Sequence, residues 1–361
     1  MLKIDVQPLP ENAQKPKPTD EKALGFGKHF SDRMFVMEYE GGQWRNPRIQ
    51  PFAPLTLSPA AMCLHYAQEI FEGMKAYWTA DGRVTLFRPR MNIARMNRSA
   101  ELLQMPTVDP DLFFEALRQL VRLERDWIPR TEGCSLYIRP TMIATDPFLG
   151  VRPSETYLFY IIVGPVGAYY PRGFVPVSIM VSEKYVRAVR GGIGSCKAAA
   201  NYAASLAGQV EAKQAGFDQV LWLDGVHMKY VEEVGTMNML FVLDDTVVTA
   251  PLEGGTILPG VTRDSVLKLL REVYQVKVEE RPLPIDEVID GAKTGRLKEA
   301  FGSGTAAIIT AVSEIGFRGQ RHRVGDGGVG KLTQRLYDDL VGIQYGRKPD
   351  PFEWVVQVYP E

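Results

Sequence analysis

Apolar residues follow two different periods along this chain, and together these predict a mixture of helices and strands. After Asp109-Pro110 the apolar positions recur at helical spacing, which predicts a helix with one buried face. These positions are Leu112, Phe113, Ala116, Leu117, Leu120 and Val121. A helix is also expected from Pro89 to about Gln104, because proline favours the first helical turn. Its polar positions are Arg95, Arg98 and Glu101.

Short apolar runs predict strands in both halves of the chain. They cover residues 84–87, 135–145, 156–163, 176–181, 219–223 and 299–306, and further helices are expected at 200–214, 262–274 and 332–343. Because helices and strands do not alternate regularly, the pattern favours an α+β architecture over a doubly wound parallel sheet. The glycines and prolines of residues 164–173 indicate a connection between domains. We therefore expect an N-terminal domain at 1–165, a linker at 166–175 and a larger domain at 176–361.

Composition and charge are those of a globular protein that binds small molecules. The 361 residues are 45% hydrophobic and carry a net charge of −1, which gives no electrostatic case for nucleic acid or an anionic membrane. Residues 1–22 are polar and contain prolines, so they are expected to form a loose arm and not a signal peptide. The most apolar stretch, 157–163, is too short to span a bilayer. Three scattered cysteines and four histidines form no CxxC or HExxH motif, so we expect a cytoplasmic protein without a metal site.

A glycine-dense turn at residues 191–194 leads to a single lysine, Lys197, which is followed by three alanines. A lysine that must lie against a planar ring and lose its proton benefits from such small neighbours, since an ordinary lysine stays charged. A solvated lysine in a flexible loop is the alternative. Cys196 is interpreted as a packing residue and not as a reactive thiol.

Three further segments offer groups that a phosphorylated pyridine could use. Glu232 and Glu233 precede an apolar strand, where at most one carboxylate would face a site; a solvated pair is the alternative. A carboxylate beside a pyridine nitrogen keeps that nitrogen protonated, as an electron-sink cofactor requires. The turns at 257–264 and 301–306 are rich in glycine and hydroxyl groups and are suited to an anion. With Lys197 and Arg95, these segments supply the groups that pyridoxal phosphate needs.

The sequence resembles the branched-chain amino-acid aminotransferases of pyridoxal-phosphate fold type IV over nearly its whole length. The matching segments are FGKHFSDRM (26–34), LHYAQEIFEGMKAY (64–77), LFRPRMNIARMNRSA (86–100), SLYIRP (135–140), GPVGAYYP (164–171), KAAANYAAS (197–205), QVLWLDG (219–225), EVGTMN (233–238), ILPGVTRDS (257–265) and FGSGTAA (301–307). The resemblance implies a small α+β N-terminal domain and a larger, β-rich pseudo-barrel domain. It also implies a homodimer whose pockets are completed across subunits.

The resemblance assigns a role to each matched residue. Lys197 would carry pyridoxal 5'-phosphate covalently and then move the proton during transfer. Glu233 would pair with the pyridine nitrogen, and Tyr202 would bond the ring hydroxyl oxygen. The phosphate would be held by Arg95, by the backbone amides of Val261 and Thr262, and by Thr305.

The resemblance also implies an aromatic substrate pocket, which suits leucine, isoleucine and valine because aliphatic side chains gain from burial against rings. Its residues would be Phe30, Phe71, Tyr137, Tyr169, Thr236 and Ala306, with Tyr66, Leu149 and Val151 contributed by the other subunit. The amino group would pass to 2-oxoglutarate, giving branched-chain 2-oxo acids and L-glutamate. The sequence does not show which cationic group would recognise glutamate.

Two departures from the family pattern are visible. Some relatives carry a Cys-x-x-Cys pair where this chain has Ala307 and Thr310, so no thiol switch is expected there. Alanines also replace the glycines that often precede the Asn-Tyr pair. The alternatives with the same fold and cofactor are a D-amino-acid aminotransferase and an aminodeoxychorismate lyase, and a non-enzymatic binder of pyridoxal phosphate is a third.

Overall fold

The computed structural model describes residues 2–167 and 174–360, which fold into two compact units. The first unit contains Met1–Pro171, Cys196–Ala200 and Gly342–Glu361, and the second contains Arg172–Ser195 and Asn201–Val341. This division differs from the expected domains at 1–165 and 176–361 in two places. The segment around Lys197 and the C-terminal segment both belong to the first unit. Tyr169 and most of the expected linker lie outside the described residues.

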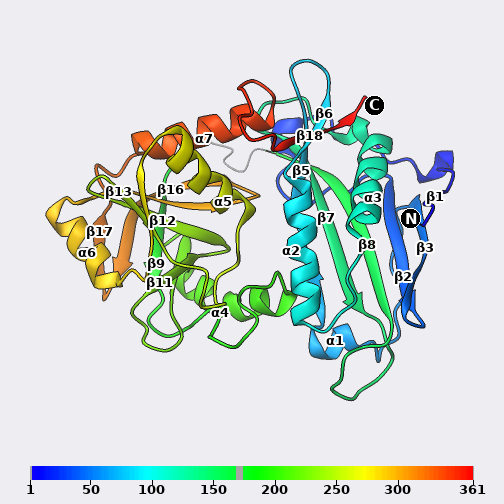
Figure 1. Ribbon diagram of the computed structural model, residues 1–361, viewed down its shortest axis with the longest axis horizontal. Helices are drawn as coiled ribbons and strands as arrows, with labels where there is room; N and C mark the ends of the chain where they lie inside the picture. The colour runs from blue at the N-terminus through cyan, green and yellow to red at the C-terminus, as the bar shows by residue number, and fades with distance from the viewer. Residues whose placement is uncertain (1, 168–173, 361) are drawn as a thin grey trace. The chain divides into compact units, whose positions relative to one another are not determined.

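The first unit is built on a nine-stranded sheet (Figure 1). Its strand order is β1 (Asp5–Val6), β3 (Gln43–Pro51), β2 (Arg33–Glu40), β8 (Tyr157–Val166), β7 (Ser135–Ala144), β5 (Met74–Trp78), β6 (Val84–Phe87) and β18 (Val355–Tyr359), with β4 (Glu69–Phe71) paired to β7. The C-terminal segment joins this unit because β18 pairs antiparallel with β6. The N-terminal arm is not loose as expected, since β1 pairs in parallel with β3 and the Lys15 N–H donates to Asp32 Oδ1 at 2.9 Å.

The helices of the first unit are α1 (Met62–Tyr66), α2 (Pro89–Leu102) and α3 (Pro110–Leu123), and short 3₁₀ turns occupy Glu11–Ala13, Glu21–Ala23 and Arg125–Trp127. Asp109 caps α3 by accepting the N–H groups of Asp111 and Leu112. The six apolar positions predicted for this helix are all buried, and the Phe113 ring lies 4.8 Å from that of Phe159 on β8. In α2, however, the expectation of a polar position at Arg95 is wrong, because its side chain is only 4% exposed.

The second unit contains a closed ring of six strands, which is the expected barrel. The ring follows the order β11 (Val231–Val234), β10 (Gln219–Leu223), β9 (Val177–Val181), β16 (Ile308–Phe317), β15 (Leu297–Gly304) and β12 (Met237–Leu243), and it closes where β12 pairs with β11. Outside the ring, β13 (Thr246–Thr249), β14 (Lys277–Glu280) and β17 (Gln320–Arg323) extend the sheet.

The remaining helices are α4 (Ala199–Gln214), α5 (Val261–Lys268), α6 (Ile285–Thr294) and α7 (Lys331–Gln344). α5 continues as a single π-helical turn at Leu269–Val273, so the expected helix at 262–274 is present but not uniform. Trp222 of β10 is fully buried and packs with Val220 and Ala212, which joins α4 to the barrel wall. Within the described ranges, no helix is both long and apolar enough to cross a membrane.

Candidate active site

Lys197 is anchored by its backbone to the first unit, immediately before α4. Its N–H donates to Ser99 Oγ at 3.1 Å, and its carbonyl accepts the Phe71 N–H at 3.0 Å. Its ammonium group lies 4.9 Å from the centre of the Phe71 ring. Ala198 is fully buried and forms a bridge with Ile70, so the small residues after the lysine allow the chain to pack against β4. Burial raises the pKa of the Cys196 thiol, which supports its interpretation as a packing residue.

Arg95 forms a buried ion pair with Glu72, a residue that the sequence reasoning missed. Its Nε and Nη2 atoms donate to the two Glu72 oxygens at 2.7 and 2.9 Å, and Asn92 Nδ2 donates to the same carboxylate at 2.8 Å. Burial raises the pKa of the Glu72 carboxyl, but the charge of Arg95 and then that of Lys197 outweigh it, so the pKa lies below its usual value. Glu72 is fully buried. In the sequence it directly follows the apolar residues Ile70 and Phe71, and this apolar neighbourhood is the one signal that could have identified it.

Arg139 is a second missed residue, and it lies against two predicted pocket residues. Its guanidinium is 4.6 Å from the ring centre of Phe71 and 5.3 Å from that of Tyr137, and its Nη2 donates to the Tyr137 hydroxyl at 3.1 Å. The buried Nε of Arg139 has no hydrogen-bond partner in the part of the chain that the structure describes. A cation therefore lies beside the aromatic pair expected to contact the substrate.

The other predicted pocket residues of the first unit lie in exposed positions. Phe30 stacks on Phe52 with ring centres 5.4 Å apart and is 36% exposed. The Tyr66 hydroxyl donates to the Leu149 carbonyl at 2.6 Å. Leu149 and Val151 are 65% and 87% exposed, so their expected contribution to a partner subunit stays a prediction.

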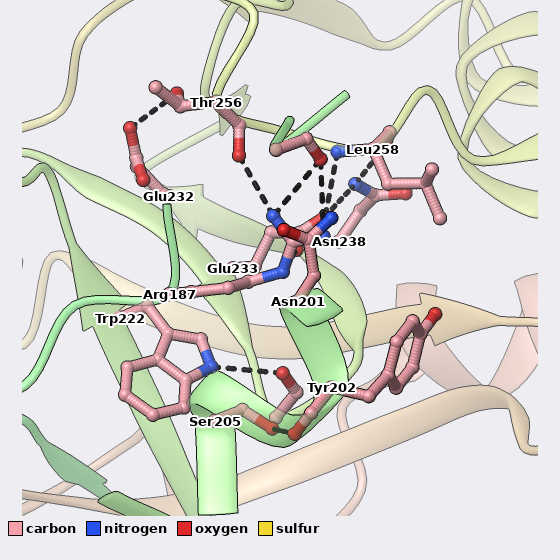
Figure 2. A network of polar contacts seen from close by, with 12 residues as sticks. Arg187, Asn201, Tyr202, Ser205, Trp222, Glu232, Glu233, Asn238, Thr256 and Leu258 are labelled. Carbon is pink, nitrogen blue, oxygen red and sulfur yellow. Dashed lines mark hydrogen bonds and ion pairs between the residues drawn. The ribbon is translucent and has the colours of Figure 1, made fainter. Parts of the chain in front are cut away.

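In the second unit, Tyr202, Glu233 and Thr236 line one small pocket together with Arg187 and Leu258. Glu233 lies on β11 and is 3% exposed. Figure 2 shows that its carboxylate faces several donors: Arg187 Nε at 2.5 Å, Asn238 Nδ2 at 3.1 Å and the Leu258 N–H at 3.1 Å. A buried carboxylate with such donors is stabilised in its charged form.

Glu232 is also buried, so the alternative of a solvated glutamate pair does not hold. Its Oε1 atom accepts a hydrogen bond from Thr256 Oγ1 at 2.5 Å. Burial raises the pKa of the Glu232 carboxyl, with a smaller effect of Asp224 in the same direction, while Thr256 and Arg187 oppose it. The two neighbouring glutamates therefore differ, because Glu233 forms a direct ion pair with Arg187 whereas Glu232 is bonded by the hydroxyl of Thr256.

Both segments expected to bind an anion have suitable backbone geometry. Val261 and Thr262 open α5, and the preceding Gly260 provides no side-chain cap, so the amides at the start of α5 are oriented as in other anion sites. Thr305 and Ala306 lie in the turn between β15 and β16. The turn ends at Ile308, whose φ of 65° is strained for a β-branched residue. Such strain commonly marks a ligand-binding turn.

These residues fit pyridoxal phosphate. The second unit presents a buried, charged carboxylate suited to a protonated ring nitrogen, and a helix start and a strained turn suited to a phosphate. The first unit presents Lys197 and the buried Arg95. No group of three or more His, Cys, Asp or Glu side chains that could hold a metal ion occurs among residues 2–167 and 174–360.

Comparison with known proteins identifies the family. The model for "Amino-transferase class IV" matches residues 69–315. The chain is 52% identical to branched-chain-amino-acid transaminase 1 of Bacillus subtilis (strain 168) over 346 residues, which cover 95% of this chain and 96% of the relative.

Solved structures agree with this match. The branched-chain amino acid aminotransferase of Escherichia coli is 28% identical with a TM-score of 0.74, over 91% of this chain and 99% of that one. The enzyme of Thermobaculum terrenum in its pyridoxal-phosphate form is 27% identical with a TM-score of 0.73, over 90% and 98%. The expected fold and family are thus confirmed, and the chain belongs to the branched-chain-amino-acid aminotransferases of class IV.

Proposed function

We propose that this chain transfers the amino group of leucine, isoleucine or valine to 2-oxoglutarate, using pyridoxal 5'-phosphate. The observation that carries the proposal is the pocket of Tyr202, Glu233 and Thr236, with its buried charged carboxylate, in a chain of this family. When bound, the cofactor accepts the amino group and withdraws electrons from the α-carbon of the substrate. The protein residues then hold, orient and move protons.

Each residue near the reaction is assigned a role. Lys197 supplies the amine that attaches the cofactor, and its Nζ atom carries the proton removed from the substrate. Glu233 keeps the ring nitrogen protonated, and Tyr202 bonds the ring hydroxyl oxygen. Arg95, the amides of Val261 and Thr262, and the hydroxyl of Thr305 hold the phosphate, which fits the geometry at the start of α5.

The aromatic residues and Arg139 support the use of two kinds of substrate. Phe71 and Tyr137 offer apolar surface for aliphatic side chains, with Phe30, Tyr169, Thr236 and Ala306 as further lining residues. The guanidinium of Arg139 lies beside the same two rings, where it can bind the second carboxylate of glutamate or 2-oxoglutarate. Arg139 thus supplies the cationic recognition that the sequence did not reveal.

The functional form is a homodimer in the cytoplasm. Tyr66, Leu149 and Val151 are exposed apolar side chains, and the hydrogen bond from the Tyr66 hydroxyl to the Leu149 carbonyl joins the end of α1 to the loop that carries Leu149 and Val151. Exposed apolar residues of this kind are suited to a contact with a second copy of the chain. Sedimentation of the purified protein at several concentrations tests this, and a monomer with full activity would refute it.

The test of the function is an absorbance spectrum of the purified protein with pyridoxal phosphate, recorded before and after L-leucine. The visible band should decrease with leucine and return with 2-oxoglutarate. Lys197→Ala should abolish this response, whereas Lys184→Ala, a change at an exposed lysine, should not. A band that responds to D-alanine but not to leucine would favour a D-amino-acid aminotransferase, and bound cofactor that responds to no substrate would indicate a binding protein.

A further inference from the structure

Arg187 is a buried arginine whose hydrogen bonds all lie within one network around Glu233 (Figure 2). Its side chain is only 7% exposed, and its Nε atom lies 2.5 Å from Glu233 Oε2. Its Nη1 atom donates to the carbonyl of Thr256 at 2.8 Å, and both Nη atoms donate to the carbonyl of Gly194 at 3.2 Å. The guanidinium is thereby fixed in position by two backbone carbonyls.

The two backbone segments that hold Arg187 are packed closely together. A Cβ atom added at Gly194 would lie 2.4 Å from the Thr256 carbonyl oxygen, so no larger residue fits without a shift of backbone. The same segment reaches Glu233 directly, since the Leu258 N–H donates to Glu233 Oε1. Leu258 bonds Oε1 of Glu233 directly, and Thr256 holds Arg187, which bonds Oε2. A shift of residues 256–258 would therefore change the hydrogen bonds of both carboxylate oxygens.

Glu232 contacts this network from the other side of Thr256. The Thr256 hydroxyl bonds Glu232 Oε1 while the Thr256 carbonyl accepts from Arg187. Glu232 Oε2 is buried and has no hydrogen-bond partner within the described residues. The charged groups that act on Glu232 are Asp224 and Arg187, and burial favours its neutral form. Arg187 bonds Glu233 directly, whereas Glu232 reaches this network through the hydroxyl of Thr256.

We propose that Arg187 is a positioning residue that sets the charge and orientation of Glu233, and that the carbonyls of Thr256 and Gly194 hold it in place. The inference rests on the proposed role of Glu233 at the pyridine nitrogen. A guanidinium at 2.5 Å makes the carboxylate less basic, so a proton shared with the pyridine stays on the ring nitrogen. Without Arg187, the buried carboxylate of Glu233 would compete better for that proton, and a bound cofactor would withdraw electrons less strongly.

The experiment compares the bound cofactor in wild-type protein, Arg187→Gln and Arg187→Lys. Arg190→Gln, a change at an exposed arginine three residues away, is the matched control. The ring nitrogen is observed by ¹⁵N NMR of labelled pyridoxal phosphate between pH 5 and 9, and kcat and KM for leucine are measured in parallel. In wild type the ring nitrogen should stay protonated over this range.

In Arg187→Gln, the ring nitrogen should lose its proton within the same pH range, and kcat should fall by about 10- to 100-fold, the size known for residues that orient a metal ligand. KM should change little, and Arg187→Lys should recover part of both signals. Arg190→Gln should resemble wild type, and if it shows the same losses as Arg187→Gln, loss of any nearby positive charge is sufficient and the proposal is wrong.

Failure of this inference is separate from failure of the proposed function. If wild type binds the cofactor and responds to leucine, but Arg187→Gln has the wild-type ring-nitrogen signal, Arg187 does not position Glu233. If the Arg187 variants do not fold, wild type alone decides: a ring nitrogen that loses its proton below pH 9 overturns the inference. A wild-type protein that binds no pyridoxal phosphate refutes the proposed function itself.

Discussion

Glu72→Gln should destabilise the first unit strongly, because it leaves Arg95 buried without its counter-charge. The Glu72 side chain is fully buried and Arg95 is 4% exposed, so water cannot replace the lost carboxylate. The carboxylate accepts two hydrogen bonds from Arg95, one from Asn92 and one from the Gly73 N–H. Glutamine keeps one acceptor oxygen and directs an amide N–H₂ group at donors.

Two independent estimates give a similar magnitude for this change. Removing one partner of a buried ion pair costs about 3–5 kcal/mol. Two unit charges about 4 Å apart, at an effective dielectric constant of about 20, interact by about 4 kcal/mol. The exposed pair of Arg90 and Asp111, whose side chains are 61% and 63% exposed, provides a contrast, since Arg90→Gln should cost only about 0–1 kcal/mol.

The assay is denaturant unfolding of the cofactor-free protein, with amide hydrogen exchange to separate the two units. The double variant Glu72→Gln/Arg95→Met should be no less stable than Glu72→Gln alone, because the orphaned charge is gone. The pKa of Glu72 is lowered in the folded state, so its stabilisation is present above the ordinary value of about 4.5 and is lost as pH falls through the folded pKa. A loss no greater than that of Arg90→Gln would refute this reasoning.

Three further changes test other parts of the structure. Burial lowers the pKa of Lys75 to about 8, so between pH 8 and 10.5 the unfolded chain binds more protons than the folded protein and the free energy of unfolding should rise with pH. Denaturant titrations should show a gain of about 3 kcal/mol over this range in wild type, and Lys75→Met should remove it. Asp109→Ala removes the cap of α3 and should cost about 1 kcal/mol by the same method, with an unchanged midpoint counting against the cap. Gly208→Ala should lower the melting temperature, because the new Cβ would lie 2.5 Å from Trp222 and overpacking costs about 1–3 kcal/mol. This cost should outweigh the helix preference of alanine over glycine, which is about 1 kcal/mol.

The sequence predicted the elements whose signals are local. The apolar stripe of α3 and its cap at Asp109 lie within one helix, and the strand at 84–87 has the bounds expected from its short apolar run. The family motifs are also local runs, which is why Lys197, Tyr202 and Glu233 could be identified as candidates without coordinates. Periodicity and capping depend on residues that are close together in the chain, so the sequence alone is sufficient to predict them.

Only the tertiary structure decided which distant residues meet. β18 pairs with β6 across most of the chain, and β1 pairs with β3 across a shorter stretch. No local pattern specifies which residues of two such distant strands lie opposite each other. Charged side chains show the same limit. Arg95 occupies a polar position in the helical pattern of the sequence. It is nevertheless buried, because its guanidinium pairs with the carboxylate of Glu72, 23 residues earlier. Arg187 follows β9 and likewise meets Glu233 of β11 only in the folded sheet, where β10 pairs with both strands; the burial that selects such pairs arises from packing of the whole fold.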